Sequence, residues 1–113
     1  MSALVRTTNF SIDWYACLAA AQRFFPHLSI EIIEEPPHQW FDAALARQIA
    51  VHMMRRVLNW PQRQIASETG RSRARVFYSL KTVDQRLIDP GFARAYERAV
   101  NGSPTGEERR SHG

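Results

Sequence analysis

Apolar residues recur every three or four positions along most of the chain, a spacing typical of the buried face of an α-helix. It predicts a first helix from about residue 11 to Phe25, with Ser11 or Asp13 as its N-terminal cap and Pro26 at its end. A longer helix is predicted over residues 39–58. The buried positions expected in these two helices are Trp14, Leu18, Ala21 and Phe25, then Phe41, Leu45, Ile49, Met53 and Val57.

Residues 28–33 fit two interpretations, because Leu28, Ile30 and Ile32 alternate as they would in a β-strand. The segment is too isolated to find a strand partner, so we favour a short helix. It is followed by Glu34-Glu35-Pro36-Pro37, where proline pushes the preceding residue out of the helical region.

Three further helices are predicted. The first covers residues 62–69, after Pro61 and before Gly70, which can end a helix in the left-handed conformation. The others cover residues 72–87 and 92–100. We therefore expect an all-α fold of about five to six helices, with residues 1–10 as a flexible N-terminus, 11–100 as one domain and 101–113 as a disordered tail or linker. The helix over 72–87 is apolar at Val76, Leu80, Val83 and Leu87.

The composition fits one small globular domain. The chain has 113 residues, of which 44% are hydrophobic, enough for a packed core. It has no apolar run of the roughly 18 residues that would span a bilayer, and its N-terminus lacks the pattern of a secretory signal. Its single cysteine, Cys17, excludes a disulfide framework. We expect a cytoplasmic protein without a membrane partner.

The charge is concentrated in the middle of the chain. The formal net charge is +4, from 15 basic and 11 acidic residues, and every basic residue except Lys81 is arginine. By segment, residues 1–45 carry 2 − 5 = −3, residues 46–86 carry 9 − 2 = +7, and residues 87–113 carry 4 − 4 = 0. This asymmetry indicates a polyanionic partner, with nucleic acid as the first candidate.

The basic segment also has the spacing of a helix-turn-helix. Such a motif needs a small residue where its two helices cross, and Ala66 supplies it. It needs a residue that can turn sharply four positions later, which is Gly70, and an apolar residue six positions after that to anchor the second helix, which is Val76. The second helix then opens with Arg73 and Arg75, whose guanidinium groups match guanine edges and phosphate oxygens. A plain helical hairpin with solvated arginines is the alternative, and the coincidence with the +7 segment favours DNA binding.

These residues show a family resemblance. The run from Ala46 to Ala50 (ARQIA) and on through Arg71–Val76 resembles the C-terminal DNA-binding domain of the bacterial replication initiator DnaA, which belongs to the Trp-repressor-like helix-turn-helix group. The resemblance implies that the helix starting near Ser72 enters the major groove. It implies backbone contacts at Gln48, Arg55, Arg63 and Lys81, and base or phosphate contacts at Ser72, Arg73, Ala74 and Arg75.

Three further residues complete the expected phosphate contacts. Gln62 and Arg71 lie at the start of the motif and in its turn, and Tyr78 lies next to its apolar anchor. Core-edge packing or a partner surface are alternative roles for Tyr78. Of Phe77 and Tyr78, which adjoin Val76, at least one must point away from the core.

The chain departs from the family in two places. The family's Asp-His-Thr-Thr signature is replaced by Ser-Arg-Ala-Arg at residues 72–75, after a turn one residue shorter, and the family's basic loop is replaced by Glu34-Glu35-Pro36-Pro37-His38. Acidic side chains would be repelled by a phosphate-lined groove, so we expect no minor-groove arm here. A phosphate-binding Gly-rich loop is also missing, which excludes the initiator's ATPase activity.

We therefore expect a nucleoid-associated bacterial transcriptional regulator that binds double-stranded DNA. Some gene transfer agent activators resembling it couple such a domain to a sigma-like or polymerase-contacting partner, and residues 101–113 would suit a linker to one. The alternative is a protein-interaction adaptor whose acidic N-terminal third or basic face docks RNA polymerase or another regulator.

The pattern gives no support to catalysis. His27, His38, His52 and His112 lack the spacing of metal ligands. Cys17 is expected to be a buried, inert thiol, and His52 a surface or boundary residue. We expect no enzyme activity, cofactor, metal or small-molecule substrate. The three tryptophans, Trp14, Trp40 and Trp60, are expected in the core or at its edge.

Overall fold

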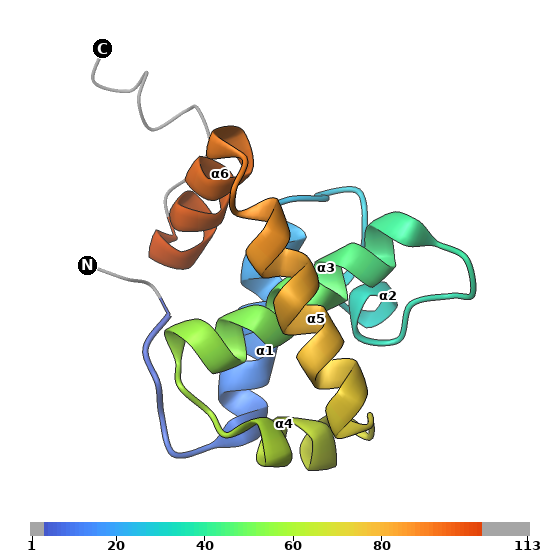
Figure 1. The fold of residues 1–113 in the computed structure, drawn as a ribbon, viewed down its shortest axis with the longest axis vertical. Coiled ribbons are helices and arrows are strands. Elements are labelled where there is room, and N and C mark those ends of the chain that lie inside the picture. Colours follow the sequence, from blue (N-terminus) through green and yellow to red (C-terminus); the bar gives the residue numbers. More distant parts are fainter. Residues whose placement is uncertain (1–3, 103–113) are drawn as a thin grey trace.

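A computed structural model describes residues 4–102, and they form six α-helices and one π-helical turn with no strand. Helix α3 runs through the centre, with α1 behind it and α5 in front, while α4 lies at one end (Figure 1). The all-α fold class is confirmed. The short helix expected within residues 28–33 is present, but it covers residues 30–34. The elements are α1 (Phe10–Gln22), α2 (Ile30–Glu34), α3 (Phe41–His52), η1 (Met53–Val57), α4 (Gln62–Thr69), α5 (Arg73–Arg86) and α6 (Pro90–Asn101).

Helix α1 begins earlier than its apolar spacing predicts. The side chain of Asn9 accepts a hydrogen bond from the backbone N–H of Ile12 at 3.1 Å, so Asn9 is the N-cap. The expectation of a cap at Ser11 or Asp13 was wrong, because Asp13 is turned into the core. Helix α2 is capped in the same way by Ser29, which accepts from the N–H of Ile32.

The predicted long helix over residues 39–58 divides into α3 and the π-helical turn η1. Two backbone hydrogen bonds that span more residues than those of an α-helix close this turn. The N–H of Leu58 donates to the carbonyl of Met53, and the N–H of Trp60 donates to the carbonyl of Met54. Of the predicted stripe, Ile49 and Met53 are fully buried, while Leu45 and Val57 are partly buried. Phe41 is 80% exposed, so its core assignment was wrong; it is the first residue of α3 and lies outside the core.

Residues 4–9 pack against the domain through specific contacts, which the prediction of a flexible N-terminus did not include. Leu4 is buried in the core. A guanidinium nitrogen of Arg6 donates to the carbonyl of Asn59 at 2.9 Å, and the group lies 4.2 Å from the centre of the Trp60 ring. Residues 103–113, which include most of the predicted tail, lie outside the described residues.

A buried carboxylate joins this N-terminal segment to the start of α4. Asp13 accepts hydrogen bonds from the backbone N–H of Thr7 at 2.9 Å and from the Thr7 hydroxyl at 2.8 Å. It also accepts from the indole N–H of Trp60 at 2.9 Å. The burial expected for Trp14 and Trp60 is confirmed, whereas Trp40 is 39% exposed.

A second polar network joins α3, α5 and α6 around His52. Asp84 lies 2.7 Å from Nε2 of His52, and the hydroxyl of Tyr96 lies 2.6 Å from Nδ1. Because Asp84 is a carboxylate that can only accept, Nε2 carries the proton and Nδ1 accepts from Tyr96. Arg56 donates to the other oxygen of Asp84 at 2.9 Å. His52 is 2% exposed, so its placement as a surface or boundary residue was wrong.

This network makes stability depend on pH. Burial lowers the pKa of His52 below 6.5, despite the opposing effect of Asp84. In the unfolded chain His52 therefore takes up a proton near pH 6.5, whereas in the folded protein it does so only at a lower pH. The free energy of unfolding is expected to fall as the pH drops below 6.5, by at most about 1.4 kcal/mol per pH unit. Urea unfolding at pH 7 and pH 5 measures this loss. His52→Gln should reduce the difference, exposed His38→Gln should not, and equal pH dependence in both variants would refute the assignment.

None of the helices within residues 4–102 combines the length and the apolar character needed to cross a bilayer.

Candidate nucleic-acid interface

Helices α4 and α5 are joined by a three-residue connection, Gly70-Arg71-Ser72. Gly70 has φ 69° and ψ 23°, the left-handed conformation that ends a helix, and its N–H donates to the carbonyl of Ala66. A Cβ added to Gly70 would meet nothing within 4 Å, so this position needs glycine for its backbone conformation rather than for space. The hydroxyl of Ser72 then caps α5 by accepting from the N–H of Arg75 at 3.1 Å.

The three positions selected from the spacing have the local structure that the prediction requires. Ala66 is a small buried residue on α4, Gly70 forms the turn, and Val76 is buried on α5. The bounds of α4, Gln62–Thr69, are those predicted. The use of this helix pair as a DNA-binding helix-turn-helix remains a prediction.

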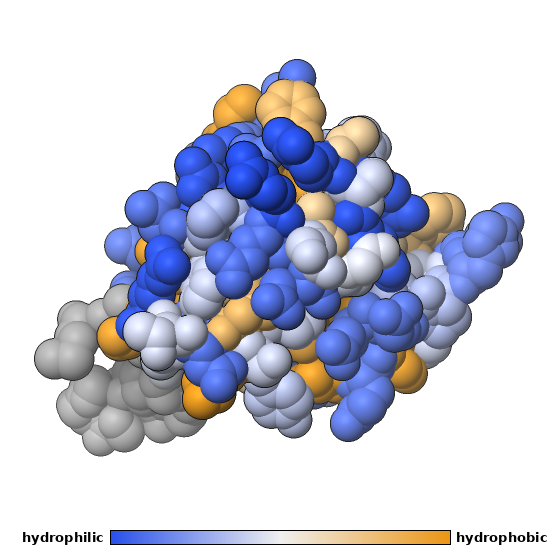
Figure 2. Space-filling model, turned by 90° about the horizontal axis from the view of Figure 1, so that it is seen from below, coloured by the Kyte–Doolittle hydropathy of each residue, from blue (hydrophilic) through white to orange (hydrophobic). Residues whose placement is uncertain are grey.

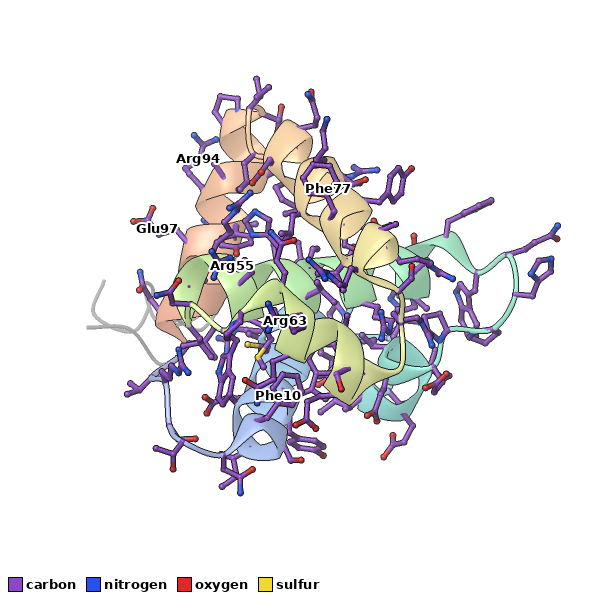
Figure 3. The ribbon with its side chains drawn as sticks, turned by 60° about the horizontal axis from the view of Figure 1, so that its bottom comes forward. Phe10, Arg55, Arg63, Phe77, Arg94 and Glu97 are labelled. Atoms are coloured by element: carbon purple, nitrogen blue, oxygen red, sulfur yellow. The ribbon has the colours of Figure 1, made fainter. Side chains whose placement is uncertain are left out.

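Four of the predicted DNA contacts line one shallow hollow beside α4. They are Arg55, Gln62, Arg63 and Arg73, and this space of about 680 Å³ is called the α4 hollow. Figure 3 shows Arg55 and Arg63 on the same side of the molecule, where α4 comes forward. Arg55 is held there by donating to the carbonyl of Trp60 at 3.2 Å. No acidic residue is among the described residues that line this hollow.

Four others line a second space, between α3 and α5. They are Gln48, Arg71, Arg75 and Tyr78, and this space of about 360 Å³ is called the α3–α5 pocket. Successive helical residues are rotated by about 100°, so Arg73 and Arg75 point to nearly opposite sides of α5. Each lines a different one of the two spaces. The N-terminal end of α5 therefore has a basic group on either side of it.

The remaining predicted residues lie along α5. Ser72 and Ala74 are exposed at its start, and Lys81 is exposed two turns further, with its ammonium group 5.6 Å from the centre of the Phe77 ring. Phe77 and Tyr78 are 53% and 65% exposed, so both point away from the core and core-edge packing of Tyr78 is excluded.

Sequence reasoning missed Arg47, which lines the α3–α5 pocket although it is mostly buried. Its Nε donates to the carbonyl of Glu34 at 3.1 Å, and its guanidinium group lies 5.6 Å from the centre of the Trp14 ring. Burial, followed by repulsion from Arg71 and Arg75, lowers the pKa of Arg47 to about 10. The sequence placed Arg47 in the segment with a net charge of +7, but it did not indicate that the side chain would line this pocket.

The acidic segment lies at the edge of the basic face. A carboxylate oxygen of Glu35 is 3.6 Å from a guanidinium nitrogen of Arg71, and the side chain of Glu35 is 74% exposed. Exposed ion pairs of this length contribute little to stability. Figure 2 shows the face seen from the α4 end, where hydrophilic groups predominate over most of the surface.

Within residues 4–102, no group of three or more His, Cys, Asp or Glu side chains could hold a metal ion. Cys17 is fully buried, as predicted, and burial together with the nearby charge of Asp13 raises its pKa to about 12, so its thiol stays protonated. His112 lies outside the described residues. Comparison with protein-family models, curated proteins and solved structures gives no match to this chain.

Proposed function

We propose that this protein is a transcriptional regulator that binds duplex DNA by placing the N-terminal end of α5 in the major groove. The observation that carries the proposal is the pair of basic groups on opposite sides of that end, one in the α4 hollow and one in the α3–α5 pocket. The major groove is bordered by two phosphate backbones, about 12 Å apart. Basic side chains on both sides of a helix in the groove can therefore reach both strands.

In this arrangement the base contacts come from the first turn of α5. Arg73 and Arg75 are exposed there and can donate two hydrogen bonds to guanine O6 and N7, while the Ala74 methyl group suits contact with a thymine methyl. Ser72 is exposed at the helix N-terminus, whose backbone N–H groups favour phosphate.

The phosphate contacts come from both sides of α5. Arg55, Gln62 and Arg63 face one strand from the α4 hollow. Gln48, Arg71 and Tyr78 face the other from the α3–α5 pocket, and Arg71 can exchange its long ion pair with Glu35 for a phosphate. Lys81 extends the basic surface along α5. This function requires no catalytic residue or cofactor, and it places the protein at the nucleoid in the cytoplasm.

A specific surface favours a protein partner as a second candidate function. Ile12 and Tyr15 are 58% and 57% exposed on α1, and Val5 is exposed in the segment before it. Helix α1 is apolar on its exposed side as well as on its buried side. This surface suits an adaptor that docks RNA polymerase, a sigma-like protein or another regulator, either in place of DNA binding or together with it.

Retention on an unrelated duplex at low salt tests the proposal. The wild-type protein should be retained, and the preferred sequence can then be selected from random duplexes. Arg73→Ala and Arg75→Ala are each expected to weaken binding to the selected sequence by about 1–3 kcal/mol, with a smaller loss on random DNA, if they read bases. Fluorescence anisotropy measures both affinities.

The matched control is Arg94→Ala, which removes an exposed arginine from α6, away from α4 (Figure 3). It should leave both affinities nearly unchanged. Equal losses on selected and random DNA would make Arg73 and Arg75 positioning residues. If the wild-type protein is not retained at all, the DNA-binding proposal fails and the adaptor is favoured.

A further inference from the structure

The α3–α5 pocket has features that phosphate contacts do not explain. Its volume of about 360 Å³ falls in the range of small-molecule pockets, roughly 300–1,000 Å³. Besides its basic residues, the pocket is lined by apolar side chains, including Pro36, Pro37, Val51 and Val76. Contacts to DNA phosphates do not require apolar lining residues, so the lining of this pocket suggests that it binds a ligand other than DNA.

Three aromatic side chains line this pocket. Trp40 and Phe41 come from the segment before and at the start of α3, and Tyr78 comes from α5. All three are exposed. The N–H of Trp40 donates to the carbonyl of Pro37 at 3.1 Å, which closes a turn that carries Trp40 to the pocket. Aromatic walls of this kind favour a planar ring, because rings stack or meet edge to face.

The same pocket has an excess of positive charge. Arg47, Arg71 and Arg75 all line it, and none of its lining residues is acidic. The Glu35 carboxylate, which does not line the pocket, lies 3.6 Å from a guanidinium nitrogen of Arg71 and offsets one of these three charges. An oxyanion in the pocket would accept hydrogen bonds from the guanidinium groups that line it and would offset the repulsion that remains among them.

We propose that the α3–α5 pocket binds a small aromatic oxyanion, with its ring against Trp40 and Tyr78 and its anionic group on Arg71 and Arg75. A carboxylate and a phosphate share this chemistry, because the guanidinium fork matches both. The regulatory consequence rests on the proposed function: Arg71, Arg75 and Tyr78 are also proposed DNA contacts, so the ligand and DNA compete and the ligand releases the protein from DNA.

The probes are 1-naphthoate and 1-naphthyl phosphate, with the neutral 1-naphthamide and non-aromatic acetate as controls. ¹H–¹⁵N NMR titration of the full chain follows the indole N–H of Trp40 and the amides around Ser79. At least one naphthyl anion should shift these signals with a Kd of about 1 mM or tighter, as its size permits. The amide and acetate should bind at least tenfold more weakly, and the stronger anion identifies the anionic group.

Variants separate this pocket from the α4 hollow. The double variant Arg71→Gln/Arg75→Gln, and separately Trp40→Ala, should weaken the anion at least tenfold. Arg63→Gln, which alters only the α4 hollow, should bind it as the wild type does. Circular dichroism confirms that each variant is folded, and any variant that is not is replaced by Tyr78→Ala, whose exposed ring can be removed without opening the core.

The outcomes distinguish the pocket from the proposed function, because DNA affinity is measured on the same preparations. The expected result is anion binding that weakens DNA binding in proportion to occupancy. Anion binding by a protein that does not bind DNA would support the pocket and refute the proposed function. DNA binding without any naphthyl shift, shifts of equal size with 1-naphthamide, or shifts spread over the whole protein would overturn the pocket. Anion binding that leaves DNA affinity unchanged would overturn the competition.

Discussion

Raising the salt concentration from 50 to 200 mM is expected to weaken binding to duplex DNA by about 10³-fold. Each phosphate neutralised by a cation contributes about −0.9 to the slope of log K against log salt, because bound counterions are released. One phosphate for each proposed cation gives a slope of about −5, and a fourfold rise in salt then lowers K by about three orders of magnitude. The cations are Arg55, Arg63, Arg71, Arg73, Arg75 and Lys81.

The positions of these side chains give the physical reason. Arg63, Arg73 and Arg75 are exposed, and within the described residues the α4 hollow contains no carboxylate that would compete with phosphate. Glu35, an acidic residue near the face, is itself exposed and pairs with Arg71 at 3.6 Å. Most of the positive charge is therefore available to DNA.

Fluorescence anisotropy with a labelled, unrelated duplex at four or more salt concentrations measures the slope. Arg63→Gln should reduce its magnitude by about 0.9, since one phosphate contact is lost. Arg98→Gln makes the same change in charge on an exposed residue of α6 and should leave the slope as it is. Binding that is flat between low and moderate salt would contradict the proposed interface, and equal effects of the two variants would show that only net charge acts.

The parts of the candidate site that the sequence predicted are those fixed by local chemistry. Helix α4 begins after Pro61 and ends before Gly70, because proline is tolerated at the start of a helix and glycine tolerates a positive φ. Both effects depend only on neighbouring residues. The α4 hollow and the α3–α5 pocket depend instead on how α3, α4 and α5 pack. Sequence spacing could not show that Arg73 would line the α4 hollow while Arg75 lines the α3–α5 pocket, or that Arg47 would also line the α3–α5 pocket.

The same limit applied to the core. Asp13 is separated from Trp60 by 47 positions, and His52 from Tyr96 by 44. An aspartate near the start of a helix is typical of a cap, and a histidine between Val51 and Met53 is typical of a boundary, so local patterns favoured the wrong roles. Both are buried polar groups whose partners come from distant elements, and such partners carry no periodic signal in the sequence.

Asp13→Ala is expected to lower the free energy of unfolding by about 3 kcal/mol. Asp13 is fully buried, and it accepts from the N–H and hydroxyl of Thr7 and from the indole N–H of Trp60. Its removal leaves that indole donor buried without an acceptor, and such a loss is unfavourable by about 1–3 kcal/mol for each group. It also frees the segment that carries Leu4 and Arg6. For a domain whose total stability is about 5–15 kcal/mol, this is a large fraction.

Urea unfolding followed by circular dichroism measures the effect. Ser11→Ala, at an exposed position of the same helix, is the control and should change stability by less than about 0.5 kcal/mol. A double-mutant cycle with Trp60→Phe separates the indole hydrogen bond from packing: the double variant should be less destabilised than the sum of the single variants by about 1 kcal/mol or more, because either change alone already breaks the bond. Additive losses would mean that the Asp13–Trp60 hydrogen bond contributes nothing to stability. Coupled losses would show that this bond stabilises the fold by joining α1 to Trp60, the residue before the N-cap of α4.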